Sequence, residues 1–329
     1  MPPSLHGRAQ QATSQKRSRF RNLDGMRNAD VLRDCWRAIT THAAYGVDRV
    51  SAQEYAHNLE DNSTHLVERL KSTSSRATLV RRHSLPKGGG KVRPLGMPVV
   101  EDTLVPLAIT RRLTAIYEQD CLRCRYGYRP HVGALEAVDA LTITRQCGRD
   151  NWVVEADITG FFATIDHAWL LRRLAERIDD RALRRLIKKW LKAGGLDPDG
   201  TVRHPATGSP QGGVVSPILA NVSLHYALEL WCEQVVKRHC HGEACLIRSA
   251  DDEVCACEHQ EDAERFSTVL GQRIQTFGLE LSGDKTRLLP CSRHPGAAPT
   301  RFEFLGFAFQ WGKERAGKAP RKRRTSRPK

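Results

Sequence analysis

The chain has 329 residues, enough to bury a substantial core and to form one large or two modest domains. Its 52 lysines and arginines exceed its 37 aspartates and glutamates, which gives a formal net charge of +15. Such a surplus favours a polyanionic partner, nucleic acid first and an anionic membrane surface second. No stretch approaches the roughly 18 apolar residues that span a bilayer, and the basic N-terminus lacks the apolar segment of a secretory signal. We therefore expect a cytoplasmic protein without a membrane partner.

The ten cysteines are irregularly spaced, and a chain without a secretory signal normally keeps its cysteines reduced. Cys121 and Cys124 form a C-x-x-C pair, and Cys255 and Cys257 form a C-x-C pair. A structural zinc site requires four ligands in paired spacing. We therefore interpret the cysteines mainly as small buried hydrophobic residues, with zinc binding as the alternative.

Both ends of the chain are basic and poor in apolar residues. Residues 313–329 contain nine lysines and arginines and one glutamate, so this tail has a net charge of +8. Segments of this composition are expected to be mobile until a polyanion binds them, and a merely solvated tail is the alternative.

Helical and strand patterns alternate between these ends. The apolar spacing predicts helices over 30–40, 52–71, 101–117, 133–147, 165–178, 181–192, 217–236 and 261–277. Strands are predicted as a pair within 77–97, and then over 152–158, 245–249, 254–257, 285–289 and 302–309. This order of elements is typical of an antiparallel sheet backed by helices, which is an α+β fold.

Three acidic residues lie at the ends of apolar strands. Asp157 closes the run 152–158, while Asp251 and Asp252 lie in the predicted turn between 245–249 and 254–257. An Asp-Asp pair at a turn is by itself usually explained by the local hydrogen bonding of aspartate. Carboxylates on neighbouring strands, with a backbone carbonyl such as that of Ile158, can also hold two Mg²⁺ ions about 3.5–4 Å apart. Such a pair of ions promotes the attack of a hydroxyl on a phosphoryl group.

Several sequence blocks, in order over about residues 20–310, resemble the reverse transcriptases encoded by bacterial group II introns. The blocks that carry the resemblance are 86–98, 126–130, 157–162, 165–167, 208–213, 216–221, 250–252, 279–286 and 302–307. The combination of Pro-Gln-Gly-Gly at 210–213 with Phe-Leu-Gly-Phe at 304–307 is highly specific.

The resemblance implies an RNA-directed DNA polymerase with the fingers and palm of a right-hand fold and an antiparallel palm sheet. It implies a basic flexible N-terminus over 1–25, a helical layer with the fingers over 26–150, a palm over 151–310 and a basic tail over 311–329. The implied substrates and partners are an RNA template, a DNA primer, deoxynucleoside triphosphates and intron RNA. The implied cofactor is a pair of Mg²⁺ ions.

The resemblance also assigns roles in catalysis and metal binding. Asp157, Asp251 and Asp252 match the catalytic, metal-binding positions, to which the carbonyl of Ile158 would be added as a ligand. Lys285 matches a lysine near the catalytic hairpin that would protonate the leaving pyrophosphate. A helix cap or a salt bridge is the alternative role of Lys285.

The implied substrate-binding residues come from three blocks. They are Lys87, Lys91 and Arg93 in a basic hairpin that would close over the triphosphate, Phe162 beside the 2′ position of the nucleotide, and Gln211 and Gly212 against the template. The alternatives are solvated surface charges, ordinary core packing of Phe162 and a plain turn at the glycines. Residues 125–130 are expected to line the template path, with a core position as the alternative for Tyr126.

The chain also departs from the family pattern. Ser249 stands where the family usually has tyrosine, which removes a ring expected to support the primer end, and Ala163 replaces an acidic residue. Only about twenty residues follow Phe309. The resemblance therefore implies that the thumb (or maturase) region and the endonuclease region are missing. Activity would be reduced unless another chain supplies the thumb. The alternative function is a non-catalytic, maturase-like RNA-binding protein that assists splicing.

Overall fold

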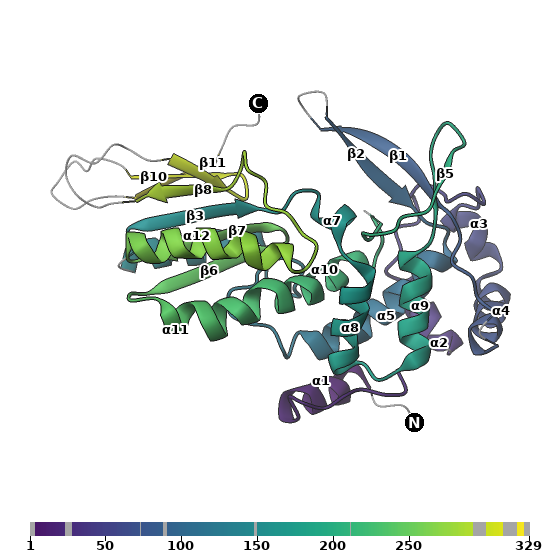
Figure 1. Ribbon diagram of the computed structural model, residues 1–329. Helices are drawn as coiled ribbons and strands as arrows, with labels where there is room; N and C mark the ends of the chain where they lie inside the picture. Colours follow the sequence, from purple (N-terminus) through teal and green to yellow (C-terminus); the bar gives the residue numbers. More distant parts are fainter. Residues whose placement is uncertain are drawn as a thin grey trace. The chain divides into compact units, whose positions relative to one another are not determined.

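The computed structural model describes residues 4–23, 28–72, 74–87, 91–147, 150–210, 212–291, 301–311 and 321–325 of the chain. The chain divides into two compact units, each built from two segments. The first unit contains Met1–Asp120 and Phe162–Val222, and the second contains Cys121–Phe161 and Ser223–Lys329. Each unit is described separately, with its elements labelled in Figure 1. The boundaries expected at 25, 150 and 310 stay a prediction.

The first unit is mainly helical. Its helices are α1 (Leu5–Ser14), α2 (Ala29–Trp36), α3 (Ala52–His57), α4 (Leu59–Lys71), α5 (Glu101–Tyr117), α8 (His167–Arg177) and α9 (Arg181–Leu191), together with α7 (Phe161–Thr164) and α10 (Ser216–Leu224) at the unit boundaries. Helices α1 and α2 pack against α5, in which Leu104, Ile109 and Leu113 are fully buried. Each such side chain contributes about 1.5–3 kcal/mol to the stability of the fold. Helix α5 is therefore the centre of this unit's core.

A small sheet with strand order β2-β1-β4-β5 completes the first unit. Its strands are β1 (Val80–Lys87), β2 (Lys91–Met97), β4 (Gly195–Leu196) and β5 (Val202–Arg203). Strands β1 and β2 form the antiparallel pair that the sequence predicts within 77–97.

Residues 4–23 of the N-terminal segment make specific contacts, while the flexibility expected for 1–25 stays a prediction. Ser4 caps α1 by accepting a hydrogen bond from the Gly7 amide, and Arg8 is buried and donates to the carbonyl of Asn22 at 2.7 Å. Phe20, which is also buried, forms a parallel bridge with Ile178. The composition of the segment did not reveal these contacts, because its few anchoring residues are widely spaced among polar ones.

The second unit contains two antiparallel sheets. The larger has the order β6-β7-β3-β8, with β3 (Trp152–Asp157), β6 (Ala244–Ser249), β7 (Asp252–Cys257) and β8 (Arg287–Pro290), and the smaller has the order β11-β10-β9, with β9 (Arg301–Phe304), β10 (Phe307–Trp311) and β11 (Arg321–Thr325). The helical elements are α6 (Ala134–Cys147), the π-helical segments η1 (His225–Glu229) and η2 (Cys232–Val236), α11 (Lys237–His239) and α12 (Gln260–Gln275).

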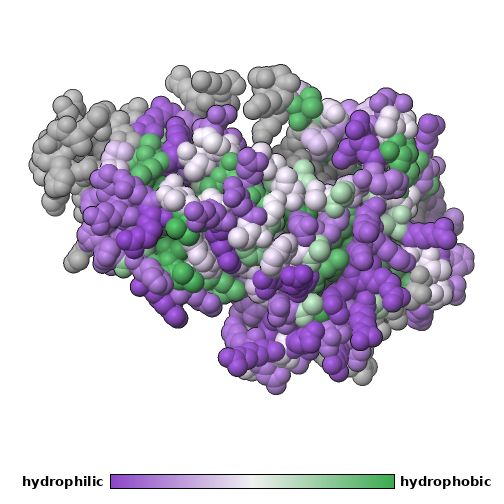
Figure 2. All heavy atoms as spheres, in the orientation of Figure 1, coloured by the Kyte–Doolittle hydropathy of each residue, from purple (hydrophilic) through white to green (hydrophobic). Residues whose placement is uncertain are grey.

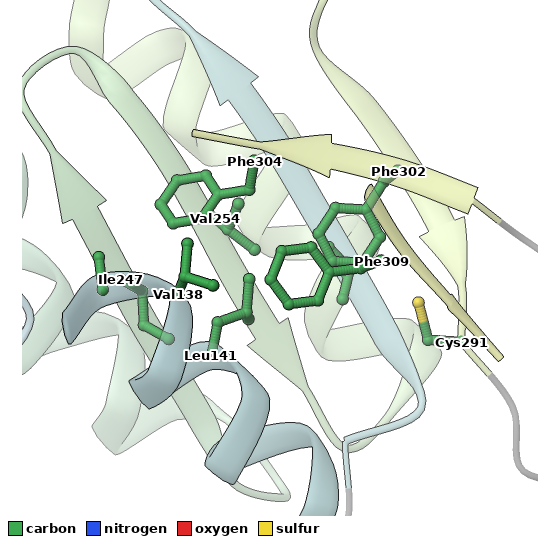
Figure 3. Close-up of a cluster of buried hydrophobic side chains, with 10 residues drawn as sticks. Val138, Leu141, Ile247, Val254, Cys291, Phe302, Phe304 and Phe309 are labelled. Carbon is green, nitrogen blue, oxygen red and sulfur yellow. The ribbon is translucent and has the colours of Figure 1, made fainter. Parts of the chain in front are cut away.

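Successive side chains of a strand point to opposite faces of the larger sheet, and different elements pack against the two faces. Figure 3 shows one face, where Val254 and Ile247 from the sheet meet Val138 and Leu141 of α6 and Phe304 of the smaller sheet. Helix α12 covers the opposite face by packing against β3 and β7 (Figure 1). The predicted antiparallel sheet backed by helices is therefore confirmed.

Several predicted elements differ from the structure. The helix predicted over 217–236 changes from α-helical to π-helical geometry at His225. The strand predicted over 302–309 is a hairpin, because Leu305 and Gly306 both have positive φ and form a tight turn between β9 and β10. The backbone of 321–325, within the predicted basic tail, forms strand β11, which pairs with β10. The rest of the predicted basic tail, residues 312–320 and 326–329, lies outside the described residues.

The surface in Figure 2 is mostly hydrophilic, with hydrophobic residues scattered among polar ones. No helix in the described part of the chain combines the length and the apolar character needed to cross a membrane.

Candidate active site

Two of the three predicted carboxylates are brought together by strand register in the second unit. Asp157, at the end of β3, is the direct cross-strand partner of Asp252, at the start of β7. Cross-strand partners in an antiparallel pair point to the same face of the sheet, so these two side chains are neighbours. Asp251 precedes Asp252 in the turn between β6 and β7.

The hairpin turn is tighter than the sequence predicts. Ser249 pairs with Asp252, so the loop consists of Ala250 and Asp251 alone, while Asp252 and Glu253 belong to strand β7. The alternation of side chains along β7 then places Asp252 on the face of Asp157 and Glu253 on the opposite face.

Lys285 forms a salt bridge, which is one of the two alternative roles predicted for it from the sequence. Its Nζ lies 2.8 Å from Oδ2 of Asp157. The hydrogen bond to Asp157 raises the pKa of Lys285, so the ammonium form is favoured in this structure. A second salt bridge joins β8 to β3. Arg287 is the cross-strand partner of Glu155, and its Nη2 lies 2.7 Å from Oε2 of Glu155.

The negative charge of the site is not fully compensated by these cations. Burial and the neighbouring carboxylates of Asp251 and Asp157 raise the pKa of Asp252 to about 6. The donors are carboxylate oxygens, which suit a hard cation such as Mg²⁺. In the described residues, however, no three His, Cys, Asp or Glu side chains are arranged so that they could hold one metal ion together. The donor chemistry thus fits Mg²⁺, whereas the ligand geometry stays a proposal, as does the carbonyl of Ile158.

Glu253 is a buried acidic residue that the sequence interpretation missed. It lies next to Asp252 on the opposite face of the sheet and is only 3% exposed. Neither of its carboxyl oxygens has a hydrogen-bond partner in the described structure. Burial, with smaller contributions from the nearby aspartates, raises the pKa of Glu253 to about 8, against the attraction of Arg248. We therefore expect Glu253 to be mainly protonated at neutral pH.

This protonation makes stability depend on pH. The pKa of Glu253 is higher in the folded chain than in the unfolded one, so its contribution to stability is complete below about pH 4.5 and is lost as the pH rises towards about 8. We expect the free energy of unfolding of the native chain to fall, relative to that of Glu253→Gln, by up to about 1.4 kcal/mol per pH unit in this window. Urea unfolding of both proteins at several pH values measures the difference. Glu264→Gln, at an exposed position of α12, is the control, and equal pH slopes for native chain and Glu253→Gln would contradict the assignment.

The segment at 125–127 supports the hairpin instead of forming an open path beside it. The amide of Arg248 donates to the carbonyl of Cys124 at 2.8 Å, and the amide of Tyr126 donates to the carbonyl of Arg248 at 2.9 Å. Tyr126 is partly buried against the core shown in Figure 3, which confirms the core alternative for this residue. Arg125 is buried, so the expected template-lining role is wrong for its side chain.

Gly127 touches the backbone of the β6–β7 hairpin. A β-carbon at this position would lie 2.3 Å from the amide nitrogen of Ala250 and 2.9 Å from the carbonyl carbon of Ser249. Both atoms belong to the backbone, so no side-chain movement could relieve the overlap. Gly127 therefore lets the chain approach the turn that carries Asp251 more closely than any other residue would.

The predicted nucleotide-binding residues belong to the first unit. Lys87 and Lys91 are cross-strand partners at the end of the β1–β2 hairpin, and Arg93 pairs with Leu85. The side chains of the three basic residues and the whole of Gln211 lie outside the described structure. The roles of these residues accordingly stay predictions.

The glycine-rich loop of the first unit is held closely against its neighbours. Gly212 has a φ of 94°, and a β-carbon there would lie 2.7 Å from the carbonyl oxygen of Gly96 in β2. The amide of Ser209 donates to the carbonyl of Phe162 at 2.7 Å. Phe162 and Gly96 also line a cavity of about 290 Å³, together with residues 205–210. Residues 205–210 thus form part of the wall of this cavity, while the role of Gly212 stays a prediction.

Comparison with known proteins identifies the family. Residues 85–309 match the family described as reverse transcriptase (RNA-dependent DNA polymerase). The chain therefore belongs to the reverse transcriptase family, as its sequence blocks indicate.

Several relatives are intron-encoded proteins. The group II intron-encoded protein LtrA of Lactococcus lactis subsp. cremoris is 36% identical over 167 residues, which cover 50% of this chain and 27% of LtrA. Protein YkfC of Escherichia coli K12 is 37% identical over 148 residues, 44% of this chain and 39% of YkfC. The putative COX1/OXI3 intron 2 protein of Saccharomyces cerevisiae is 34% identical over 146 residues, 44% of this chain and 17% of that protein. The match thus spans less than half the length of these relatives.

Proposed function

We propose that the chain is an RNA-directed DNA polymerase of the group II intron type, which transfers a nucleotide to the 3′-hydroxyl of a primer. The observation that supports the proposal most directly is the pairing of Asp157 with Asp252, beside Asp251 in a tight turn, in a member of the reverse transcriptase family. The proposed substrates are an RNA template, a DNA primer and deoxynucleoside triphosphates, and intron RNA is a proposed partner.

We propose that the larger sheet of the second unit is the palm of this polymerase. Asp157, Asp251 and Asp252 would hold two Mg²⁺ ions, which would supply Lewis acidity at the attacking hydroxyl and at the leaving pyrophosphate. The sheet holds these carboxylates on adjacent strands, and helices pack against both faces of the sheet. Such fixed groups need little rearrangement when charge develops during the reaction.

Lys285 has two compatible roles in this scheme. Its ammonium group neutralises Asp157 at 2.8 Å and would have to leave that carboxylate when another cation binds there. A released ammonium group beside the site would be placed to donate a proton to the leaving pyrophosphate, as the family resemblance suggests. While Lys285 is paired with Asp157, the hydrogen bond between them raises its pKa, so the residue is protonated before it is released.

The residues of the first unit would bind the nucleotide and the template. We propose that the β1–β2 hairpin, with Lys87, Lys91 and Arg93, forms fingers that contact the triphosphate. Arginine suits this role because its planar guanidinium group binds phosphate oxygens at two points. We propose that Gln211 and Gly212 lie against the template.

Phe162 gives this assignment a specific test. If its ring excludes a 2′-hydroxyl, Phe162→Ala should raise the efficiency of ribonucleotide incorporation relative to deoxyribonucleotide incorporation by about tenfold or more, the range that one filled contact provides. Incorporation of each nucleotide type at a single template position measures the ratio. Phe161→Leu, at a buried neighbouring ring, is the control for packing. An unchanged ratio in Phe162→Ala would assign the ring to core packing alone.

The proposed function as a whole is tested by primer extension. The purified chain is mixed with a DNA primer annealed to an RNA template, deoxynucleoside triphosphates and Mg²⁺. We expect template-directed addition of nucleotides that chelation of Mg²⁺ abolishes. Binding of the primer and template without addition of any nucleotide, at every Mg²⁺ concentration tried, would overturn the proposal.

A further inference from the structure

The turn that carries Asp251 adopts a backbone conformation that its sequence does not favour. Ala250 has a φ of 59°, although two-residue hairpin turns with positive φ at this position usually use glycine. Left-handed backbone at an alanine costs roughly 1–2 kcal/mol. Contacts elsewhere must therefore hold the turn in this conformation.

Arg248 provides such a contact from the buried side of the turn. Its Nη1 donates a hydrogen bond of 2.6 Å to the carbonyl oxygen of Ala250. The side chain of Arg248 is completely buried, so it cannot move aside into solvent. Arg248 thus fixes the peptide group that directly precedes Asp251.

Arg248 is in turn oriented by Glu229, a fully buried residue at the end of η1. Nε of Arg248 lies 2.9 Å from Oε1 of Glu229, and its Nη2 also bonds this oxygen. Arg125 binds the same carboxylate, with Nε 2.8 Å from Oε1 and Nη2 2.6 Å from Oε2. His225 completes the cluster, because its Nδ1 lies 2.9 Å from Oε2. Although burial alone would raise the pKa of Glu229, Arg248 and Arg125 hold it well below its ordinary value.

This cluster is a costly way to fill a core. Burying two guanidinium groups and a carboxylate carries a desolvation penalty of several kcal/mol per ion, and apolar side chains of the same volume often stabilise a protein equally well. The cluster joins three distant parts of the chain, namely the segment around Arg125, the π-helical segment η1 and strand β6. The cluster contacts the Ala250–Asp251 turn through Arg248, which suggests a role beyond stability.

We propose that Arg248, oriented by Glu229 and Arg125, is a positioning residue that holds the Ala250–Asp251 turn in its strained conformation and thereby sets the rate of nucleotide transfer. The inference rests on the proposed polymerase function. None of the cluster residues is exposed enough to contact a substrate, so their effect should be on the turnover number and not on nucleotide binding.

A matched pair of variants separates positioning from stability. Arg248→Lys and Arg125→Lys make the same chemical change and weaken contacts to the same carboxylate. Only Arg248 donates to the carbonyl of Ala250, since the side-chain hydrogen bonds found for Arg125 in the described structure go to Glu229 and His225. We expect comparable losses of thermal stability from both. Arg248→Lys should lower kcat by about tenfold or more with KM for the nucleotide within about twofold, while Arg125→Lys should change kcat by less than about threefold.

Hydrogen exchange of the peptide that covers 246–254 gives a readout that does not depend on activity. We expect these amides to exchange faster in Arg248→Lys than in Arg125→Lys when both are compared at equal global stability. Faster exchange only in Arg248→Lys supports the positioning role even if the native chain proves inactive, in which case the polymerase proposal fails by itself. Equal exchange in the two variants, or kcat losses that simply follow the loss of stability, would overturn the inference.

Two further variants cover the case in which Arg248→Lys does not fold. The triple substitution of Arg125, Glu229 and Arg248 by methionine removes all three buried charges together, a change that commonly preserves folding. We expect it to show the same low kcat and the same fast exchange of the hairpin. Ala250→Gly in that background should restore part of the lost rate, because glycine adopts a φ of 59° without strain. Native activity and native exchange in the triple variant would show that the cluster does not position the turn.

Discussion

Replacing Asp251 by alanine is expected to abolish nucleotide incorporation while leaving the affinity for RNA nearly unchanged. The carboxylate lies in the turn between β6 and β7 and contributes to the negative charge that raises the pKa of Asp252. Its loss removes a proposed oxygen ligand for the hard cations, and we expect the rate of nucleotide transfer to fall by about a thousandfold or more, equivalent to about 4 kcal/mol in the barrier. Single-turnover primer extension measures the rate, and fluorescence anisotropy with labelled RNA measures the affinity.

Asp157→Asn is the second arm of the same experiment. It keeps the shape of the side chain at the end of β3 but removes the charge that pairs with Lys285 and adjoins Asp252. We expect a similar loss of rate. Asp284→Asn, at an exposed position next to Lys285, is the matched control and should retain native activity. If incorporation and RNA affinity fall together in the Asp251 and Asp157 variants, the carboxylates have a structural role and the proposed catalytic site is wrong.

Local patterns were sufficient to predict most elements of both units. The helix predicted over 101–117 coincides with α5, and the one predicted over 181–192 with α9, since apolar residues at helical spacing mark the buried face. The strands around Asp157 and Asp252 were predicted for the same reason, because buried strands consist of short apolar runs. The candidate site followed from acids that close these runs.

The supports of the site could not be predicted in this way. Glu229 lies in an apolar helical pattern, and the partners of its carboxylate are 104 and 19 residues away at Arg125 and Arg248. Sequence spacing carries no information about pairings at such distances. One signal was present, because Arg248 is a charged residue within an otherwise apolar strand and indicates a buried polar partner.

Turn geometry was the other source of error. The hairpin turn was predicted to be four residues long because Ala-Asp-Asp-Glu appears polar, yet Asp252 and Glu253 complete the ladder of β7. Register depends on which residues face the core, and here Val254 must share a face with Ile247 and Val153. A four-residue turn would leave these residues on the same face, so the turn length follows instead from the direct pairing of Val254 with Ile247, while the pairing of β7 with β3 places Asp252 opposite Asp157.

Gly127→Ala is expected to damage the site without removing any group that takes part in the chemistry. The added methyl group would lie 2.3 Å from the nitrogen of Ala250 and 2.9 Å from the carbonyl carbon of Ser249, so the hairpin backbone must move. A shift of even about 1 Å in a catalytic group can lower a rate by about a hundredfold. We therefore expect a loss of kcat of this order, with a destabilisation of about 1–3 kcal/mol from overpacking.

The same substitution at Gly283 provides the control for Gly127→Ala. A β-carbon at Gly283, in the same unit, would have no heavy atom of the described structure within 4 Å, so alanine there should leave the rate unchanged. Steady-state primer extension gives kcat for both variants, and thermal unfolding gives their stability. A rate for Gly127→Ala within about threefold of the native value would show that the turn tolerates displacement. That outcome would also weaken the positioning role of Arg248, because both residues act on the peptide groups around Ala250. A loss of rate in Gly127→Ala together with one in Arg248→Lys would instead locate the rate-determining geometry in the conformation of this turn.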